Sequence, residues 1–308
     1  MITSSSGSSQ AVSRIAPTPS GYLHIGNAYN FLFSWLLTKK LGGTLILRID
    51  DLDQQRVRSV FLEDIFRTID WLGINYDAGP TGPEEHLSQY SQIHRRALYE
   101  NAAYSLKDHL YGCSSSRKEI QQHSIDGQYP LSFRKQHLSL EDPQVAWRML
   151  TPEGAEVSWH DGLLGTVSID LFSTMRDFIL RKKDGQVSYQ LASLVDDLHM
   201  QVNTVCRGRD LLPSSAAQLF LASALGEKNF LGVSFYHHAL LTDEEGKKLS
   251  KSHQALSMFQ TAYSPTLKQR LFNSMLRRLG REVNSVETAE ELLKSVSLAE
   301  ILQLGDNL

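Results

Sequence analysis

The sequence lacks three features that would each indicate a particular class of protein. It has only two cysteines, Cys113 and Cys206, which excludes a disulfide-stapled secreted scaffold and predicts a reducing compartment. Its first residues, MITSSSGSSQ, carry no basic segment followed by an apolar one, so we expect no secretory signal. No uninterrupted apolar run is long enough to span a bilayer. We therefore expect a cytoplasmic protein without a membrane partner.

A strong excess of charge of either sign is also missing. The formal net charge is −3, so no global field draws the chain to nucleic acid, and an RNA partner would need a local basic surface. The tail offers Lys268, Arg270, Arg277, Arg278 and Arg281, although such residues more often form a solvated helix face. What is present, 41% hydrophobic and 21% charged residues over 308 positions, is typical of a globular protein of about two domains.

Hydrophobic periodicity predicts an α/β fold with a parallel sheet. A strand at 11–17 (AVSRIAP) precedes a helix at 27–41, and a buried strand at 44–50 (TLILRID) precedes a second helix at 57–72. Gly73 is expected to end the second helix. This alternation of strands and helices is typical of parallel α/β sheets.

The pattern is weaker in the middle of the chain and returns after it. A helix is predicted over 88–110, and the proline-interrupted segment 111–165 indicates an inserted subdomain. Asp184-Gly185 predicts a hairpin between DFILRK and VSYQLA, with a helix over 190–200. Ser214 is expected to cap SSAAQLFLASALG, and FYHHALLT has the pattern of a strand. The tail predicts two amphipathic helices, TLKQRLFNSMLRRLG and VETAEELLKSVSLAEILQL.

The stretch HIGN, residues 24–27, lies after the first predicted strand and at the entry of the first helix. The first turn of a helix has unpaired N–H groups and partial positive charge, which favours phosphate. Gly26 leaves room for a ligand to approach closely, and His24 can donate hydrogen bonds to the same phosphate. Alone, the four residues are a weak motif, because a histidine before a glycine is common at helix entries.

A cationic motif, KKLSKS at 247–252, follows an acidic turn at 243–246. Lys248 and Lys251 are three residues apart and can neutralise the charge on a leaving pyrophosphate. The alternative is a solvated charge run on a loop, which is the usual setting of lysines. In this order, HIGN and KKLSKS resemble the HIGH and KMSKS signatures of class I aminoacyl-tRNA synthetases.

Longer blocks narrow the resemblance to one family. RIAPTPSGYLHIGNA and LGGTLILRIDDLD are similar to RFAPSPTGxLHIG and GGxxxLRIEDTD of glutamyl-tRNA synthetases. VSYQLASLVDDLHMQVNTVCRGRDLLPSSAAQLFLASALG is similar to the second half of the same enzymes. Because the chain stops at Leu308, it most resembles the truncated relatives, the glutamyl-queuosine tRNA(Asp) synthetases, and we expect no anticodon-binding domain.

The resemblance implies a class I synthetase fold, a Rossmann-like parallel sheet with an inserted subdomain and C-terminal helices. The expected organisation is a disordered tail at 1–10, the first half of the catalytic domain at 11–110, the inserted subdomain at 111–165, the second half with the KMSKS-like loop at 166–260, and C-terminal helices at 261–308.

The activity implied is that of a ligase. ATP with Mg²⁺ would activate L-glutamate to glutamyl-adenylate by in-line attack of the α-carboxylate on the α-phosphate, helped mainly by positioning and charge neutralisation. The glutamyl group would then pass to an RNA acceptor, foremost queuosine in the anticodon of tRNA(Asp). The expected partners are glutamate, ATP and tRNA, and the chain is expected to be a monomer. Two alternatives stay open: a glutamylating enzyme with another acceptor, and a non-catalytic nucleotide-binding protein.

The resemblance also implies the residues of the site. Arg14 and Arg207 match the family's substrate arginines, and arginine suits carboxylates because its fork donates two parallel hydrogen bonds. Asp50 matches a family glutamate that holds the substrate ammonium, but it is one methylene shorter. The expected residues are Arg14, Thr18, Asp50, Tyr189 and Arg207 for glutamate, His24, Gly26, Asn27 and Lys251 for ATP, and His24, Lys248 and Lys251 for catalysis.

Two stretches bear on a metal site. The run DDLD at 50–53 can suggest one, but alternate strand positions point in opposite directions, so Asp51 and Asp53 are expected to fix the loop or pair with Arg48 and Arg56. The glutamyl-queuosine tRNA(Asp) synthetases, which the chain resembles, often hold zinc in the inserted subdomain with Cys-x-Cys, Tyr and a further Cys. Here serines follow Cys113 and no other cysteine is near, so we expect no metal.

Overall fold

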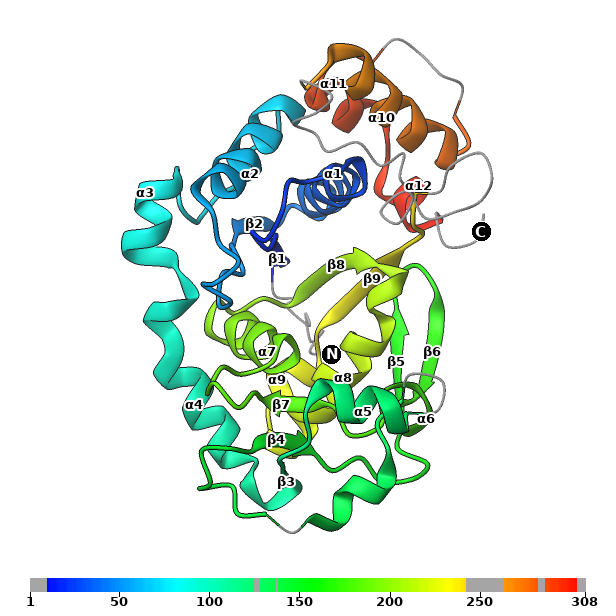
Figure 1. Ribbon diagram of the computed structural model, residues 1–308. Helices are drawn as coiled ribbons and strands as arrows, with labels where there is room; N and C mark the ends of the chain where they lie inside the picture. Colours follow the sequence, from blue (N-terminus) through cyan, green and yellow to red (C-terminus); the bar gives the residue numbers. More distant parts are fainter. Residues whose placement is uncertain (1–9, 125–127, 137, 242–262, 282–285, 304–308) are drawn as a thin grey trace, which may run out of the picture.

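The computed structural model describes residues 10–124, 128–136, 138–241, 263–281 and 286–303. Strand β1 (Val12–Ile15) pairs in parallel with β2 (Thr44–Leu47). Helix α1 (Ile25–Lys40) connects the two strands, and α2 (Ser59–Leu72) follows β2 (Figure 1). The predicted order of strands and helices and the parallel pairing are therefore confirmed.

A four-stranded sheet holds strands from the second half of the chain. In order across the sheet they are β6 (Gly165–Asp170), β5 (Glu156–Asp161), β9 (Ser234–His238) and β8 (Thr204–Gly208). Strands β8 and β9 are parallel, with α8 (Leu212–Leu225) and α9 (Lys228–Leu231) between them. The Asn203 N–H donates to the Val12 carbonyl at 3.0 Å, and its side-chain oxygen accepts from the Val12 N–H at 2.8 Å. The start of β8 thus lies beside the start of β1.

A third, antiparallel sheet lies at the end of the molecule opposite helices α10 (Pro265–Arg278) and α11 (Ala289–Ser295) (Figure 1). Its strands are β3 (Leu110–Cys113), β4 (Ala146–Met149) and β7 (Ile179–Arg181), with the short helices α5 (Arg117–His123) and α6 (Leu171–Met175) nearby in the chain. The β5–β6 hairpin crosses the predicted subdomain boundary at residue 165, and β5 joins β9 through Asp161 opposite Phe235. The division of the chain into units stays a prediction.

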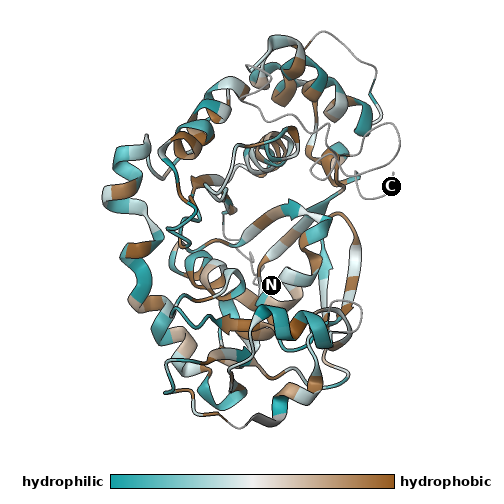
Figure 2. Cartoon of the chain, in the orientation of Figure 1, coloured by the Kyte–Doolittle hydropathy of each residue, from teal (hydrophilic) through white to brown (hydrophobic). Residues whose placement is uncertain are grey.

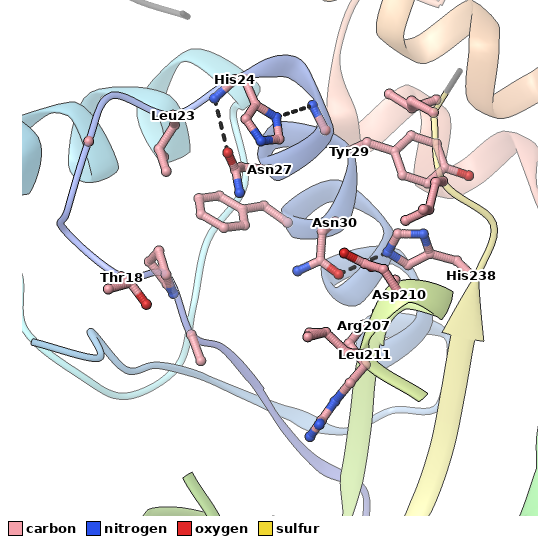
Figure 3. A pocket seen from close by; sticks show the side chains of 18 of the residues that line it. Thr18, Leu23, His24, Asn27, Tyr29, Asn30, Arg207, Asp210, Leu211 and His238 are labelled. Carbon is pink, nitrogen blue, oxygen red and sulfur yellow. Dashed lines mark hydrogen bonds between the residues drawn. The ribbon is translucent and has the colours of Figure 1, made fainter. Parts of the chain in front are cut away.

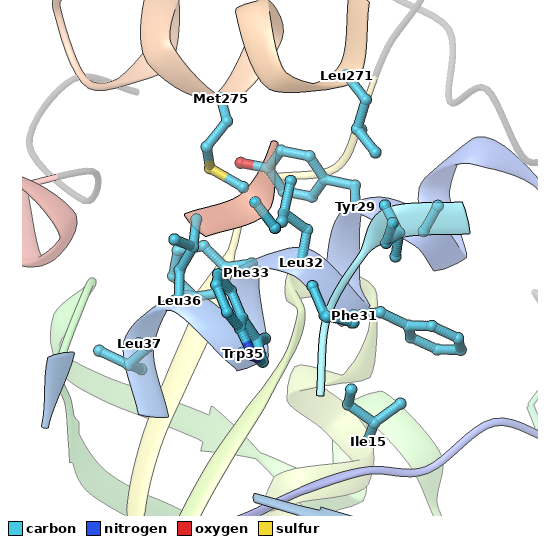
Figure 4. Close-up of a cluster of buried hydrophobic side chains, with 14 of the residues drawn as sticks. Ile15, Tyr29, Phe31, Leu32, Phe33, Trp35, Leu36, Leu37, Leu271 and Met275 are labelled. Atoms are coloured by element: carbon cyan, nitrogen blue, oxygen red, sulfur yellow. The ribbon is translucent and has the colours of Figure 1, made fainter. Parts of the chain in front are cut away.

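Helix α1 is buried between the sheets and the C-terminal helices. Those helices are α10 (Pro265–Arg278), α11 (Ala289–Ser295) and α12 (Leu298–Leu302). Figure 4 shows Leu271 and Met275 of α10 beside Tyr29 and Leu32 of α1. Figure 2 shows hydrophobic and hydrophilic residues along both α2 and α10, as expected for helices that cover a core with one face. This packing fixes the entry of α1, where the HIGN motif lies.

The prediction of one helix over 88–110 is wrong. The region contains α3 (Pro83–Glu85), a π-helical turn (His86–Tyr90), a 3₁₀ turn (Gln92–Arg95), α4 (Arg96–Ser105) and a further 3₁₀ turn (Lys107–His109). The break lies at Ser91 and Gln92, where the Ser91 hydroxyl and the Gln92 N–H donate to the Asp51 carboxylate at 2.6 and 2.8 Å. These long-range bonds compete with the helical ones, and hydrophobic periodicity does not reveal them.

The turn at Asp184-Gly185 forms as predicted, but its second arm is not a strand. Gly185 has a φ of +86°, a conformation that glycine adopts readily. A bridge between Arg181 and Val187 follows the turn, and α7 (Tyr189–His199) then begins. The helix predicted over 190–200 is therefore confirmed, and it absorbs most of VSYQLA.

Two further helix ends differ from the prediction. Ser214 does not cap α8, which begins at Leu212 with Pro213 in its first turn, where the fixed φ of proline suits a helix start. The last predicted helix is divided into α11 and α12, because Ser297 begins a new capping box with Glu300. Residues 1–9 of the predicted disordered tail and the KKLSKS motif lie outside the described residues.

Within the described part of the chain, no helix combines the length and the apolar character that crossing a membrane requires.

A buried carboxylate joins the broken segment to α7. Asp196 accepts hydrogen bonds from Gln92 Nε2 at 2.8 Å, from Arg95 Nε at 2.7 Å and from the Tyr99 hydroxyl at 2.7 Å. The Asp196 side chain has no solvent exposure. Since buried polar groups are costly without partners, these four side chains stabilise one another only as a set.

We expect Asp196→Ala to lower the free energy of unfolding by about 3–5 kcal/mol, because it leaves the Arg95 charge without its buried partner. Chemical denaturation followed by circular dichroism measures this. Asp70→Ala, at an exposed position of α2, is the matched control and should change stability by less than about 0.5 kcal/mol. Equal midpoints for the two variants would contradict the role of Asp196.

Candidate active site

A cavity of about 490 Å³ lies where the carboxyl ends of β1, β8 and β9 meet the N-terminal end of α1 (Figure 3). Its lining comes from five segments: Pro17 and Thr18 after β1, His24, Gly26, Asn27 and Asn30 at the start of α1, Tyr189 of α7, Arg207, Gly208, Asp210 and Leu211 at the end of β8, and His238, Leu240 and Leu241 at the end of β9. The carboxyl ends of parallel strands are the usual place for ligands in α/β sheets.

The HIGN motif forms a reciprocal helix cap at this cavity. The His24 side chain accepts from the Gly26 N–H through Nδ1 at 3.1 Å, and the His24 N–H donates to Asn27 Oδ1 at 3.0 Å. The first-turn N–H groups of a helix are expected to be unpaired, whereas here His24 accepts from the Gly26 N–H and from the Asn27 N–H. With Nδ1 accepting, a neutral His24 ring carries its proton on Nε2.

A side chain at Gly26 would crowd the His24 cap. A Cβ atom at this position would lie 3.0 Å from both Cε1 and Nδ1 of His24. The glycine therefore lets the His24 ring lie over the helix start. The sequence predicts Gly26 only as space for a ligand. The structure adds a second reason for glycine, because the residue two positions after His24 lies under the His24 ring.

Arg207 offers two hydrogen-bond donors at the other end of the cavity. The residue is 3% exposed, and its Nη1 donates to Gln218 Oε1 at 2.9 Å. Its Nε and Nη2 atoms are buried and have no hydrogen-bond partner among the described residues. Burial lowers the pKa of Arg207, because the protein surrounds its charge with too little compensation. Thr18 and Tyr189, both predicted for glutamate, line the same cavity.

Two other predicted residues, Arg14 and Asp50, lie in a buried ion cluster outside the cavity lining. Arg14 Nε donates to Asp197 Oδ1 at 2.9 Å, and Arg48 Nη1 donates to the same oxygen at 2.5 Å. Arg48 also donates to both carboxylate oxygens of Asp50, at 2.7 and 3.1 Å. Asp50 is thus held by Arg48, a partner we had expected for Asp51 or Asp53. Burial raises the pKa of Asp50 despite Arg48.

Asp51 and Asp53 do not belong to this cluster. Asp51 fixes the loop, as one of our two alternatives stated, through Ser91, Gln92 and His86, whose Nε2 lies 3.0 Å from Asp51 Oδ2. Asp53 Oδ2 lies 4.0 Å from Lys182 Nζ instead of pairing with Arg56 or Arg48. The three aspartates of DDLD therefore have three different sets of partners.

A buried triad that the sequence did not reveal supports the wall behind Arg207. His237 Nδ1 lies 2.5 Å from Asp161 Oδ2, and Ser215 Oγ lies 2.7 Å from His237 Nε2. These residues are at most 1% exposed, so no substrate reaches the serine as it would in a hydrolase. Ser215 and Gln218 lie on one face of α8 and hold His237 and Arg207, which are register partners on β9 and β8.

The described residues do not form a metal centre of the kind the resembling family often holds. No group of three or more histidine, cysteine, aspartate or glutamate side chains with metal-binding geometry occurs in the described ranges. The Cys113 sulfur accepts from the Tyr129 hydroxyl at 3.1 Å, and serines take the place of further thiols. This donor set does not fit zinc. Lys248 and Lys251 lie outside the described residues.

Asn30 and His238 form a pair in the cavity that sequence reasoning also missed. His238 Nε2 lies 2.9 Å from Asn30 Oδ1, and Nδ1 lies 2.9 Å from the Ala239 carbonyl. His238 is 6% exposed and contacts the rings of Tyr29 and Phe33. Burial lowers the pKa of His238 from 6.5 to about 4. The pair joins α1 to β9 across 208 residues of sequence, so no local pattern indicates it.

We expect the stability of the chain to fall as pH falls from about 6.5 to about 4, in part through His238. The unfolded chain takes up a proton in this range while the folded ring stays neutral, which costs the folded state about 3 kcal/mol at the lower end. Urea unfolding at pH 7 and pH 4.5, on wild type and His238→Gln, measures the difference. The variant should lose less stability on acidification. Equal losses would show that His238 contributes nothing to acid sensitivity.

Comparison with known proteins gives matches over most of the chain. The family model "tRNA synthetases class I (E and Q), catalytic domain" matches residues 10–305. Glutamate–tRNA ligase 2 of Cereibacter sphaeroides is 34% identical over 298 residues, which cover 92% of this chain and 64% of that protein. Glutamate–tRNA ligase of Legionella pneumophila is 32% identical over 295 residues, covering 94% of this chain and 61% of that protein.

A solved structure gives the same result for the fold. The glutamate-tRNA synthetase from Elizabethkingia anophelis superposes with a TM-score of 0.74 at 24% identity, over 94% of this chain and 66% of that chain. The predicted class I α/β fold is therefore confirmed. The chain spans less than two thirds of the length of these relatives.

Proposed function

Because the chain belongs to the catalytic-domain family of the class I tRNA synthetases for glutamate and glutamine, we propose that it activates L-glutamate with ATP and transfers the glutamyl group to RNA. One observation carries the proposal. A single cavity joins the capped start of α1 to a buried arginine, Arg207, that has two donors without partners among the described residues. Such a cavity suits a triphosphate at one end and a carboxylate at the other.

Arg207 favours glutamate over glutamine as the amino acid. Its charge is buried, and its pKa is lowered because the surroundings compensate that charge poorly. A carboxylate placed at Nε and Nη2 would supply both the missing charge and two parallel hydrogen bonds, whereas a carboxamide would supply an acceptor without the charge. Thr18 and Tyr189, which line the same cavity, are proposed as further substrate contacts. Arg14 and Asp50 belong to the buried ion cluster outside the cavity lining, and they are proposed to act on the substrate through their charges.

His24, Gly26 and Asn27 are proposed to hold the polyphosphate of ATP, which would be bound with Mg²⁺. The positive end of α1 favours the phosphates, and the cap holds His24 and Asn27 in fixed orientations. Lys248 and Lys251 of the KKLSKS motif are proposed to neutralise the pyrophosphate as it leaves. Of these residues, His24, Lys248 and Lys251 would act in the chemical step.

The proposed reaction has two steps. An oxygen of the glutamate α-carboxylate attacks the α-phosphorus, the new O–P bond forms, and the bond to pyrophosphate breaks in line with it. A hydroxyl of the RNA acceptor then attacks the activated carbonyl and releases AMP. In both steps the residues named here position groups and neutralise charge, and they form no covalent bond with substrate.

The acceptor is proposed to be queuosine in the anticodon of tRNA(Asp), on the sequence resemblance to glutamyl-queuosine tRNA(Asp) synthetases. The first alternative is a glutamylating enzyme with another acceptor, and the second is a nucleotide-binding protein without activity. A monomer and a cytoplasmic location stay predictions. Two experiments separate these possibilities, one for each step of the reaction.

For the first step, we expect pyrophosphate exchange without RNA to be strongest with glutamate among the twenty amino acids. Arg207→Lys keeps a charge but loses the fork, so kcat/KM for glutamate should fall by about 100-fold, corresponding to about 3 kcal/mol, with little change in the KM for ATP. Arg281→Lys, at an exposed ion pair with Glu300, is the matched control and should exchange normally. Equal exchange with every amino acid would reject the proposed substrate.

For the second step, we expect acylation of tRNA(Asp) that contains queuosine and none of the same tRNA with guanosine at that position. Radioactive glutamate retained on purified tRNA measures the transfer. Acylation of tRNA(Glu) instead would favour the first alternative. Binding of ATP with neither exchange nor acylation would favour the second.

A further inference from the structure

We propose that Asn30 reads the base of the bound nucleotide: its amide oxygen accepts a hydrogen bond from the exocyclic amine of adenine, and His238 holds the amide in the required orientation. This inference rests on the proposed function, because it takes the nucleotide of this cavity to be a triphosphate bound at the start of α1. It adds a specificity-determining residue, Asn30, and a positioning residue, His238.

The shape of the cavity leaves one wall for the base. The dipole of α1 favours phosphates at its first turn, where the N–H groups of Gly26 and Asn27 are themselves paired with His24. A carboxylate is favoured at Arg207. Asn30 lies three residues beyond Asn27 on α1, about 4.5 Å further along the helix axis. Beside it the lining continues through His238, Leu240 and Leu241 (Figure 3). The lining also holds Asp210, whose charge acts on His238. Two leucines with a few polar groups are expected around a flat, largely apolar ring that carries a few polar atoms.

The hydrogen bonds of His238 determine which atom Asn30 presents. The Ala239 carbonyl can only accept, so His238 Nδ1, at 2.9 Å, must carry a hydrogen. A neutral imidazole has only one N–H, and burial keeps this ring neutral near pH 7, because it lowers the pKa to about 4. Nε2 is therefore an acceptor, and the Asn30 atom that bonds to it must be the amide nitrogen.

The amide orientation follows from this pairing. The oxygen and nitrogen of an asparagine amide exchange places by rotation of the end group, and the hydrogen-bond network determines the assignment. As drawn in Figure 3, Asn30 Oδ1 lies 2.9 Å from His238 Nε2 and the amide nitrogen faces the cavity. Because Nε2 accepts, we assign the opposite orientation, in which Nδ2 donates to His238 Nε2 and the oxygen faces the cavity. The cavity therefore presents an acceptor at this wall, and an acceptor selects a donor on the ligand.

The surroundings of His238 hold its ring in place. The rings of Tyr29 and Phe33 each lie 5.2 Å from it, centroid to centroid. Arg278 of α10 donates to the Ala239 carbonyl at 3.3 Å and to the Leu240 carbonyl at 3.0 Å, which fixes the chain where it leaves β9. Both the ring and its Nδ1 partner are therefore preorganised, so little ordering is needed when a base binds.

Adenine and guanine differ at the atom that Asn30 would meet. Adenine carries an amine at position 6, which donates, whereas guanine carries a carbonyl there, which accepts. An acceptor opposite an acceptor leaves both groups unpaired in a desolvated site, and sites built around a hydrogen bond discriminate strongly against such ligands. We therefore expect selection for ATP over GTP that depends on Asn30.

The test is a chemical double-mutant cycle by isothermal titration calorimetry at pH 7.5 with Mg²⁺. Wild type and Asn30→Ala are each titrated with ATP and with purine riboside 5′-triphosphate, which lacks only the exocyclic amine. In wild type, the analogue should bind about tenfold more weakly than ATP, and in Asn30→Ala this ratio should fall to about one. His238→Leu, which leaves the amide without its acceptor, should also reduce the ratio and should weaken discrimination against GTP.

Asn27→Ala is the matched control, because it removes an amide from the same helix at the phosphate end. It should weaken ATP, GTP and the analogue by the same factor. Equal binding of ATP and the analogue by wild type would overturn the inference and leave the proposed function standing, and this comparison needs no variant to fold. A ratio of about tenfold that persists in Asn30→Ala would overturn it as well. No binding of ATP by wild type would overturn the proposed function and this inference together.

Discussion

Two buried arginines share one carboxylate oxygen, and the site depends on this contact. Arg14 on β1 and Arg48 after β2 both donate to Asp197 on α7, which ties the two ends of the β1–β2 unit to the second half of the chain. Arg207 lies nearby, and its charge and that of Asp197 influence each other's pKa. Asp196, which pairs with Arg95, lies 3.9 Å from Arg48, so four arginines (Arg14, Arg48, Arg95 and Arg207) face three carboxylates (Asp50, Asp196 and Asp197) and positive charge is in excess. An anionic ligand would complete the balance.

The start of α1 shows how one short motif serves the fold and the site together. The His24 side chain accepts from the Gly26 N–H, and the Asn27 side chain accepts from the His24 N–H. The absence of a side chain at Gly26 leaves space for the histidine ring. The ring and the amide are thereby held where a polyphosphate would lie. Asn30, about one turn further along α1, is held by His238 of β9. Preorganisation of this kind lowers the ordering cost of binding.

How much the sequence could predict depends on whether the determining contact is local. Local patterns predict the α1 entry and the parallel pair β1–β2, and both are found where expected. Arg207, which the family resemblance predicts, lines the cavity, and its role stays a prediction. Three other features depend on partners that only folding brings together. They are the helix break at Ser91, the ion pair of Arg48 with Asp50, and the triad at His237. A single sequence has the residue types for these contacts but not their pairing. For the same reason, the placement of Arg14 and Asp50 behind the cavity could not be foreseen.

The bond from Arg278 to the carbonyls of Ala239 and Leu240 links the C-terminal helices to the cavity wall. Any ligand that prefers this arrangement of the wall must, by reciprocity, strengthen the docking of α10, and loosening of α10 must weaken that ligand by the same free energy. The C-terminal helical unit is thus thermodynamically coupled to whatever occupies the cavity. A macromolecule that contacts α10 from outside would be able to adjust the affinity of the cavity without entering it.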